Sequence, residues 1–254
     1  MAELEQELAG KVAIVTGSAR NIGRATAREL ARAGAALIIN ARTSKDLCEQ
    51  VAHEIISDGG RALPFITDIT DADAVARMVG AATAEFGGVD ILVNNAAVRG
   101  RKPFVELDAA SWQLAMGAAF QGAFIMSHAC APHMIARGGG SIIGMGGLNS
   151  YRGQPERAHS MASKAGLAGL MRGLAFDLGK HNIRSNVVVV GTFDTDLAGS
   201  SSSKTEPPNA SAIPLGRLGV PQDVADLIRF LVGPRAGFIS GQTIHLNGAE
   251  HCPF

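Results

Sequence analysis

Short apolar runs alternate with longer stretches of helical periodicity along nearly the whole chain, and this alternation constrains the fold more than any other feature. The runs are 11–16, 36–40, 62–67, 89–94, 140–145, 183–190 and 242–247, and the expected helices span 22–33, 44–57, 71–86, 108–136, 157–179 and 221–232. Strands that are apolar on both faces and separated by helices predict a parallel sheet covered on both sides, with right-handed crossovers. We therefore expect a doubly wound α/β fold of Rossmann type, with residues 1–254 forming a single domain.

Length and charge narrow the classes of function. The chain has 254 residues, which is near the upper limit for one hydrophobic core. Its 23 basic and 23 acidic residues cancel, so nothing favours binding to nucleic acid or to an anionic membrane. The expected partner is a small molecule.

Cysteine usage and the N-terminal sequence bear on the compartment. Cys48, Cys130 and Cys252 are scattered, without metal-site spacing or a disulfide framework, which fits a reducing cytoplasm. The first ten residues are acidic rather than a basic and apolar leader, and no apolar run approaches the ~18 residues of a membrane span. We expect a soluble, cytoplasmic protein without a metal.

A glycine-containing loop follows the first expected strand and opens the first helix. In TGSARNIGRA (16–25), glycines permit a tight turn and close approach of a pyrophosphate to free N–H groups at the helix N-terminus. Asn21 replaces a further glycine, and Asn tolerates left-handed dihedrals better than most residues. An ordinary tight turn is the alternative. The expected dinucleotide contacts here are Gly17, Ser18, Arg20, Asn21, Ile22 and Gly23.

The ends of the second and third strands suggest which dinucleotide binds. Arg42 lies about twenty residues past the glycine loop, where an arginine accommodates a 2′-phosphate, and Arg20 adds a second cation. These two residues favour NADP, with NAD as the alternative, unless they are ordinary surface charges. Asp68 and Ile69 are placed to hold an adenine ring, although Asp68 is also well placed to cap the next helix.

Taken together, these motifs resemble the short-chain dehydrogenase/reductases, and 3-oxoacyl-ACP reductases among them, over essentially the full length. The matches are TGSARNIG (16–23), Asp68, NNAA (94–97), ASKAGLAGL (162–170), Gly191, Thr195 and GQTIHLNGA (241–249). The resemblance implies a nicotinamide-dependent oxidoreductase and a homodimer or homotetramer. It also implies further cofactor contacts from Asn95, Ala96, Lys164, Gly191, Thr192 and Thr195.

The resemblance fails at the proton-transfer residues. The family's tyrosine, serine and asparagine positions fall on Ser160, Gly147 and Ala119, and only Lys164 is kept. A positioned acid contributes about 10²–10⁴-fold to carbonyl reduction, and donors to the oxyanion another ~10²–10³. A serine hydroxyl is a poor proton donor at neutral pH. The retained lysine also hydrogen-bonds the nicotinamide ribose in the family, so it argues for cofactor binding rather than for catalysis.

Other residues near this position are candidate proton donors. Tyr151, the only tyrosine, lies in the loop after the fifth strand, where Asn149 or Arg152 would hold the substrate oxygen; simple loop packing is the alternative. His159 is five residues from Lys164, about 140° around a helix, so a capping or surface role is favoured over chemistry. The candidate catalytic set is Lys164, Tyr151, Ser160 and His159.

The remaining expectations concern a loop and a helix. Residues 199–214 are rich in Ser, Pro and Asn, and a loop longer than about 12–15 residues is often a mobile functional lid or a disordered segment; we expect a substrate lid over 192–214. Trp112 is expected in the core or at a subunit interface, on an amphipathic helix.

Three functions stay open on the sequence alone. The first is an NADP-dependent oxidoreductase acting on a small carbonyl, alcohol, imine or activated alkene, with an unconventional proton donor or none. The second is a dinucleotide-binding protein without turnover, serving as a sensor or a structural subunit. The third is a lyase, isomerase or hydrolase on the same fold, although Ser160 and Lys164 four residues apart show no oxyanion hole in the sequence.

Overall fold

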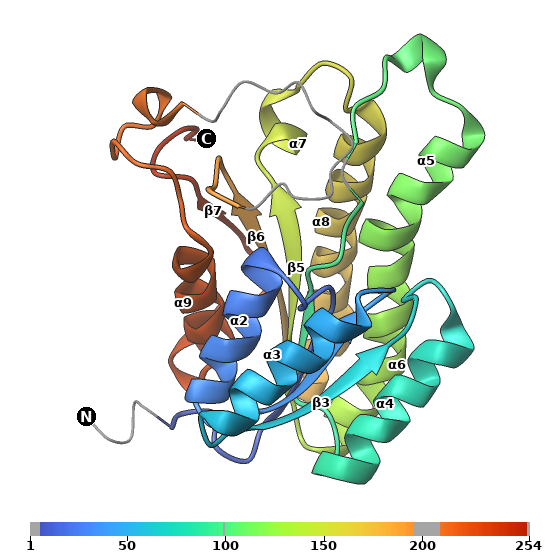
Figure 1. Cartoon of the computed structure of the whole chain (residues 1–254), viewed down its shortest axis with the longest axis vertical. Helices are drawn as coiled ribbons and strands as arrows, with labels where there is room; N and C mark the ends of the chain where they lie inside the picture. The colour runs from blue at the N-terminus through green and yellow to red at the C-terminus, as the bar shows by residue number, and fades with distance from the viewer. Residues whose placement is uncertain (1–5, 99, 196–208, 253–254) are drawn as a thin grey trace.

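A seven-stranded parallel sheet forms the centre of the computed structural model, which describes residues 6–98, 100–195 and 209–252 (Figure 1). The strand order is β3-β2-β1-β4-β5-β6-β7. The strands are β1 (Val12–Val15), β2 (Ala36–Ala41), β3 (Arg61–Ile66), β4 (Ile91–Asn94), β5 (Gly140–Gly147), β6 (Ile183–Val190) and β7 (Thr243–Leu246). Every neighbouring pair is parallel. The predicted doubly wound fold is confirmed.

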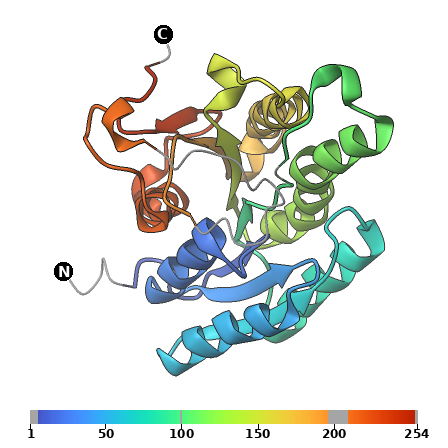
Figure 2. The same cartoon turned by 45° about the horizontal axis from the view of Figure 1, so that its top comes forward.

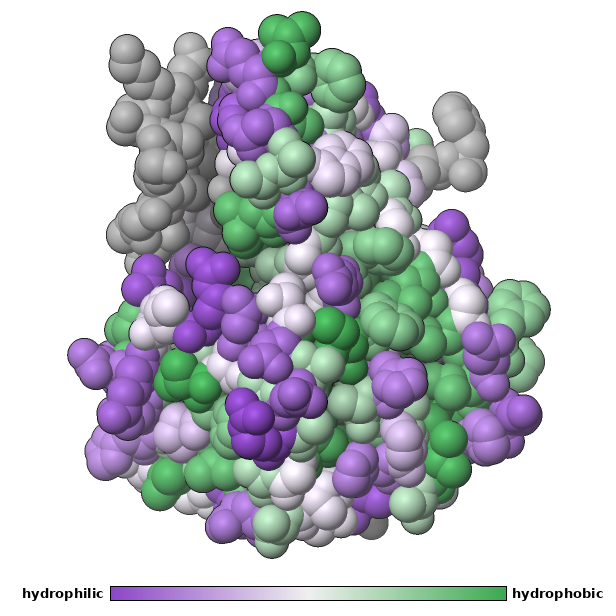
Figure 3. Space-filling model, turned by 90° about the vertical axis from the view of Figure 1, so that its right-hand side faces the viewer, coloured by the Kyte–Doolittle hydropathy of each residue, from purple (hydrophilic) through white to green (hydrophobic). Residues whose placement is uncertain are grey.

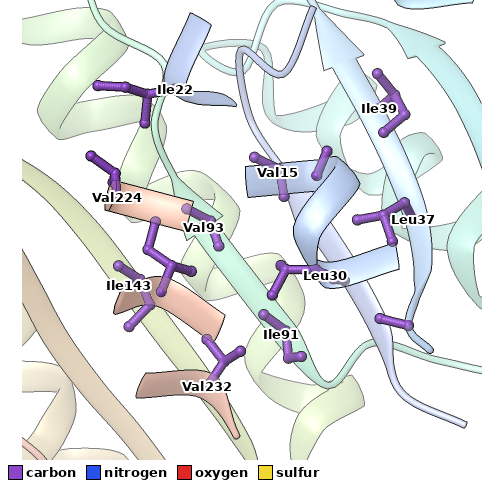
Figure 4. Packing of buried hydrophobic residues seen from close by; sticks show 14 of the residues in the cluster. Val15, Ile22, Leu30, Leu37, Ile39, Ile91, Val93, Ile143, Val224 and Val232 are labelled. Atoms are coloured by element: carbon purple, nitrogen blue, oxygen red, sulfur yellow. The ribbon is translucent and has the colours of Figure 1, made fainter. Parts of the chain in front are cut away.

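Helices cover both faces of this sheet, and each face has its own apolar core (Figures 1 and 2). One core joins the sheet to α2 (Asn21–Arg32), α3 (Lys45–Ser57) and α9 (Pro221–Val232). Figure 4 shows Leu30, Val224 and Val232 packed on Val93 and Ile143 in this core. The other core joins the sheet to α4 (Ala72–Phe86), α6 (Gly122–Ala136) and α8 (Ala158–Leu178). Because strands such as β1, β2 and β4 are buried on both faces, their sequences are apolar without alternation.

The chain reverses its winding between β1 and β4. From β1 it proceeds outward to β2 and β3, and it then returns to place β4 on the other side of β1. In folds of this kind the loops leaving the carboxyl ends of the two strands at such a reversal diverge to opposite faces, and ligands bind in the crevice between them. This edge of the sheet carries the candidate site.

The predicted helix over 108–136 is interrupted in the structure. It consists of α5 (Ala109–Met116), a π-helical turn (Gly117–Gln121) and α6. Directly after the π-helical turn, α6 packs closely on Ile69, because a β-carbon on Gly122 would lie 2.6 Å from Ile69 Cδ1. The other helices match their predicted bounds to within one residue.

One helical stretch bears on the expectation that no segment spans a membrane. Within the described residues, Ala109–Ala136 is long and apolar enough to cross a membrane by length and composition, and fewer than half of the residues in its most apolar window are buried. In the fold this stretch packs against α4 and α8. The stretch is therefore part of the helical layer on one face of the sheet, and one of its sides is apolar and exposed. On α5, for example, Trp112 is 39% exposed.

The expected lid falls largely outside the described residues, since 196–208 are not among them. Residues 209–214 contain a short 3₁₀ turn, Ala210–Ala212, in which Asn209 Oδ1 accepts a hydrogen bond from Ser211 N. The lid stays a prediction.

Candidate functional site

Thr16 and Asn95 join the carboxyl ends of β1 and β4. Thr16 Oγ1 accepts hydrogen bonds from the backbone N–H groups of Asn95 and Ala96, each at 3.0 Å. The Asn95 amide donates to the carbonyl oxygens of Thr16 at 2.9 Å and Gly17 at 3.1 Å. The two strand ends are thereby held in one fixed arrangement at the bottom of the crevice. Thr16 was not singled out in the sequence analysis.

Asn40, at the end of β2, is a second junction that the sequence analysis missed. Its side chain is almost fully buried; Oδ1 accepts from Gly17 N at 3.3 Å, and Nδ2 donates to the carbonyl oxygens of Phe65 and Thr67, both at 3.2 Å. Ser18 Oγ accepts from Asn40 N at 2.9 Å, so the Ser18 side chain faces the protein. The signal was a polar residue closing an otherwise apolar strand, because buried polar groups require partners.

The turn from β1 into α2 has the conformation that the sequence predicted. Gly17 has φ +64° and Asn21 has φ +48°, so Asn21 does take a left-handed conformation. A β-carbon on Gly23 would lie 2.3 Å from Gly17 O, which leaves room for no side chain. Ile22 is buried in the core beneath the loop. Arg20, which precedes α2, makes no side-chain capping hydrogen bond, and the first turn has no acidic residue.

Two arginines lie close in sequence to the carboxyl ends of β1 and β2. Arg20 Nη2 lies 3.5 Å from Ser44 Oγ, in the segment between β2 and α3, and Arg42 is exposed just after β2. Asp68 is half-buried after β3, where the backbone N–H of Thr70 holds the pKa of this carboxyl below its ordinary value, with a smaller effect from Arg42. Asp71, not Asp68, caps α4. Ile69 is buried against α6.

These features fit a nicotinamide dinucleotide. The loop between β1 and α2 lacks side chains at the two glycines where a pyrophosphate would approach, and it opens onto a helix N-terminus, which favours an anion. Arg20 and Arg42, both exposed, follow β1 and β2. The described residues contain no cluster of three or more His, Cys, Asp or Glu side chains suited to a metal ion.

The nicotinamide end of the crevice would lie beyond β5 and β6. Lys164, on α8, donates from Nζ to the carbonyl oxygen of Met145 in β5. Gly191 follows β6 and has no room for a side chain, because a β-carbon would lie 2.7 Å from Asn247 Cβ. Thr192 donates both its N–H and its hydroxyl to the Glu250 carboxylate, at 2.8 and 2.9 Å. Thr195 is half-buried at the end of the described segment.

Comparisons with known proteins agree with this geometry. Residues 17–249 match the family model described as enoyl-(acyl carrier protein) reductase. The chain is 36% identical to cis-4-hydroxycyclohexanecarboxylate dehydrogenase of Sinomonas cyclohexanicum, over 96% of this chain and 97% of that protein. It is 32% identical to a 3-oxoacyl-[acyl-carrier-protein] reductase of Staphylococcus aureus, over 95% and 98%. The solved structure of a 7α-hydroxysteroid dehydrogenase, complexed with NADH and 7-oxo glycochenodeoxycholic acid, superposes with a TM-score of 0.90 at 34% identity, covering 96% of each chain.

The chain belongs to the short-chain dehydrogenase/reductase family. Its relatives are named as dehydrogenases and reductases, which classes it as an NAD(P)-dependent oxidoreductase.

The sequence analysis expects the family's asparagine, serine and tyrosine positions at Ala119, Gly147 and Ser160, and all three carry small side chains. Gly147 ends β5, and a β-carbon placed there would meet nothing within 4 Å. Ala119 is buried in the π-helical turn. Ser160 is half-buried in the first turn of α8, and its carbonyl accepts from Ser163 Oγ at 2.9 Å.

The loop after β5 places Tyr151 against β7. Tyr151 lies on α7 (Asn149–Arg152) and is 40% exposed, and its ring meets the His245 ring edge-on at a centroid distance of 4.7 Å. Arg152 pairs with Glu250 at 2.8 Å, and Asn149 Nδ2 donates to Gln154. The two residues expected to hold a substrate oxygen therefore have partners within the protein.

His159 is placed differently from the sequence expectation. It is 7% exposed and lies inside α8, whose N-cap is Arg157, so the favoured capping or surface role is wrong. Its Nε2 would be 3.8 Å from a β-carbon on Gly100, in the segment after β4. Because α8 begins at Ala158, the turn of about 140° between His159 and Lys164 stands. The sequence did not indicate that His159 would be buried.

Proposed function

We propose that this protein is an NADP-dependent oxidoreductase acting on a small carbonyl, alcohol, imine or activated alkene, without the tyrosine that the family uses as proton donor. The observation that carries the proposal is the contrast within one crevice. The loop between β1 and α2 is held by Thr16, Asn40 and Asn95, whereas Gly147 and Ser160 stand at the positions where the family has its serine and its tyrosine.

The nicotinamide cofactor would supply hydride, and the chain's residues would bind and orient it. Gly17 and Gly23 would admit the pyrophosphate, and Arg20 and Arg42 would pair with the 2′-phosphate, as guanidinium forks suit phosphate oxygens. Asp68 would accept from the adenine amino group. Lys164 would hold the nicotinamide ribose, a role that requires only a flexible donor.

The missing tyrosine bears on the substrate class. Reduction of a ketone creates an alkoxide, so it gains most from a positioned acid. A protonated imine or an activated alkene needs less help, and the matching family model bears the name of an alkene reductase. Relatives named for a cyclohexane hydroxy acid and for 3-oxoacyl thioesters add those two carbonyl classes. Any acid that is needed comes from Tyr151, His159 or Ser160.

The experiment is a turnover screen. The purified protein is mixed with NADPH and a panel of cyclic ketones, 3-oxoacyl thioesters, imines and enones, and loss of NADPH absorbance is followed. Oxidation with at least one substrate is the expected result. Tight NADPH binding without any oxidation, together with new ketone activity in a Ser160→Tyr, Gly147→Ser double variant, would favour a silent dinucleotide-binding protein. Conversion of a substrate with NADPH unchanged would favour a lyase or isomerase.

Self-association through α5, α6 and α8 is part of the proposal. These helices leave Trp112, Leu114, Phe124 and Phe176 between 39% and 89% exposed. Figure 3, viewed from the side of α5 and α6, shows apolar side chains spread over this face between polar ones. Contiguous exposed apolar surface commonly marks a protein interface. A homodimer or homotetramer packed through these helices would cover it.

The proposed compartment is the cytoplasm. Cys48, Cys130 and Cys252 are free, and burial raises the pKa of Cys48 to about 11 and that of Cys130 to about 12. Thiols kept in the reduced, unreactive form suit a reducing compartment.

A further inference from the structure

The carboxylate of Glu250 ties together three segments around the proposed nicotinamide end of the crevice. Its side chain is 6% exposed. Oε2 accepts from Thr192 N at 2.8 Å, Oε1 accepts from Thr192 Oγ1 at 2.9 Å, and Arg152 Nη1 lies 2.8 Å from Oε1. The C-terminal segment, the loop after β6 and the loop after β5 therefore meet at one side chain.

A turn with two left-handed residues precedes Glu250 and directs its carboxylate toward Thr192 and Arg152. Gly248 and Ala249 both have positive φ, +60° and +68°, and the left-handed conformation is unfavourable for an alanine. Asn247 stabilises the turn, since its Oδ1 accepts from Ala249 N and its Nδ2 donates to His251 O. Gly191 leaves the space that Glu250 uses, because a β-carbon there would lie 2.8 Å from Oε2. Strain of this kind persists where surrounding structure enforces it, often at functional sites.

We propose that Glu250 is a positioning residue that makes Thr192 a pure acceptor for the carboxamide of the nicotinamide ring. The inference rests on the proposed function. A threonine hydroxyl has one proton and two lone pairs. Since that proton and the backbone N–H are both donated to Glu250, the lone pairs of Thr192 Oγ1 are the groups left to meet a ligand. They suit the –NH₂ of a carboxamide, whose own oxygen would need a different donor.

The test separates the two halves of the cofactor. Adenosine 2′,5′-bisphosphate carries the adenosine and the 2′-phosphate but no nicotinamide, whereas NADPH carries all three. Both are titrated calorimetrically into wild type and into Glu250→Gln. In this variant the amide –NH₂, a donor, would face a donor of either Arg152 or Thr192, so one hydrogen bond would be lost. We expect NADPH to bind about tenfold more weakly to the variant, the size of one lost hydrogen bond, and the bisphosphate to bind unchanged.

Asp90→Asn is the matched control for a disrupted buried carboxylate. Asp90 is 3% exposed in its side chain, pairs with Arg137 at 2.9 Å and accepts from Val12 N at 2.9 Å, but it precedes β4 at the opposite end of the sheet. Its replacement should leave the ratio of the two affinities unchanged. Thr192→Val gives a second variant, which should also weaken NADPH selectively, with little added effect when combined with Glu250→Gln.

An equal loss of affinity for both ligands in Glu250→Gln would indicate a merely structural role and would overturn the proposal. So would unchanged binding of both, or additive effects of Thr192→Val and Glu250→Gln. If Glu250→Gln does not fold, the selective effect of Thr192→Val on NADPH decides alone. Failure of wild type to bind either ligand would instead refute the proposed function, and this inference with it.

Discussion

Gly23 offers a prediction whose size follows from the structure. In Gly23→Ala the added β-carbon would lie 2.3 Å from Gly17 O, 2.6 Å from Asn95 Nδ2 and 2.9 Å from Ser18 Cα. Ordinary contact begins at 3.4 Å, so these groups must move by up to roughly 1 Å. All three belong to the junction that holds the loop between β1 and α2. The substitution thus tests whether that arrangement is what binds the dinucleotide.

The expected energies have opposite signs. Replacing a helical glycine with alanine gains up to about 1 kcal/mol in helix propensity, whereas overpacking costs about 1–3 kcal/mol. The net loss of stability should be about 0–2 kcal/mol, and for a chain of this size 1 kcal/mol is about 2–4 °C in melting temperature. Displacement of the loop should weaken NADPH binding at least about tenfold, or 1.4 kcal/mol.

Gly80→Ala is the control, because Gly80 lies in α4 and a β-carbon there would meet nothing within 4 Å. It should melt slightly above wild type and bind NADPH equally. Thermal melting and calorimetry on the three proteins measure both effects. A Gly23→Ala protein that melts at or above wild type and binds NADPH with unchanged affinity would refute the reasoning.

Three further predictions follow from other contacts. Arg42→Ala should weaken NADPH about tenfold, by loss of a charged hydrogen bond, without changing NADH binding; an equal effect on both dinucleotides in calorimetry would contradict this. Burial raises the pKa of Glu29, but hydrogen bonds from Arg229 and Gln222 outweigh this effect and hold the pKa below 4.5. The ionised Glu29 carboxylate therefore stabilises the fold above pH 4.5, and this stabilisation disappears as the pH falls through the lowered pKa. Glu29→Gln should therefore lose stability at pH 7 in denaturant melts and lose progressively less below pH 4.5, whereas a deficit independent of pH would argue against it. Phe124→Asp, at a position 52% exposed on α6, should reduce the mass in light scattering from a dimer or tetramer to a smaller species, and an unchanged mass would exclude this face from the interface.

The sequence predicted the sheet because a strand that is buried on both faces consists almost entirely of apolar residues. β6, for example, has the bounds that its apolar run predicted. The π-helical turn at Gly117–Gln121 was not predicted, because its residues continue the apolar helical pattern on both sides of it.

In the candidate site, too, the local sequence predicted some residues and missed others whose role depends on distant contacts. Gly17, Asn21 and Gly23 were predictable because the left-handed turn and the close approach require particular residue types. Glu250 was missed because its partners Arg152 and Thr192 are far from it in the chain, and a lone acid near a C-terminus carries no pattern. Asn40 had a readable signal at the end of an apolar strand.

Calorimetric titration of the wild-type protein with NADPH and NADH tests the central claim most directly, namely that the dinucleotide half of the crevice is intact. The arrangement of Thr16, Asn40 and Asn95, with Arg20 and Arg42 beside it, predicts binding of NADPH at least about tenfold tighter than NADH. Absence of heat with both dinucleotides, at concentrations that saturate a characterised family member, would contradict the account.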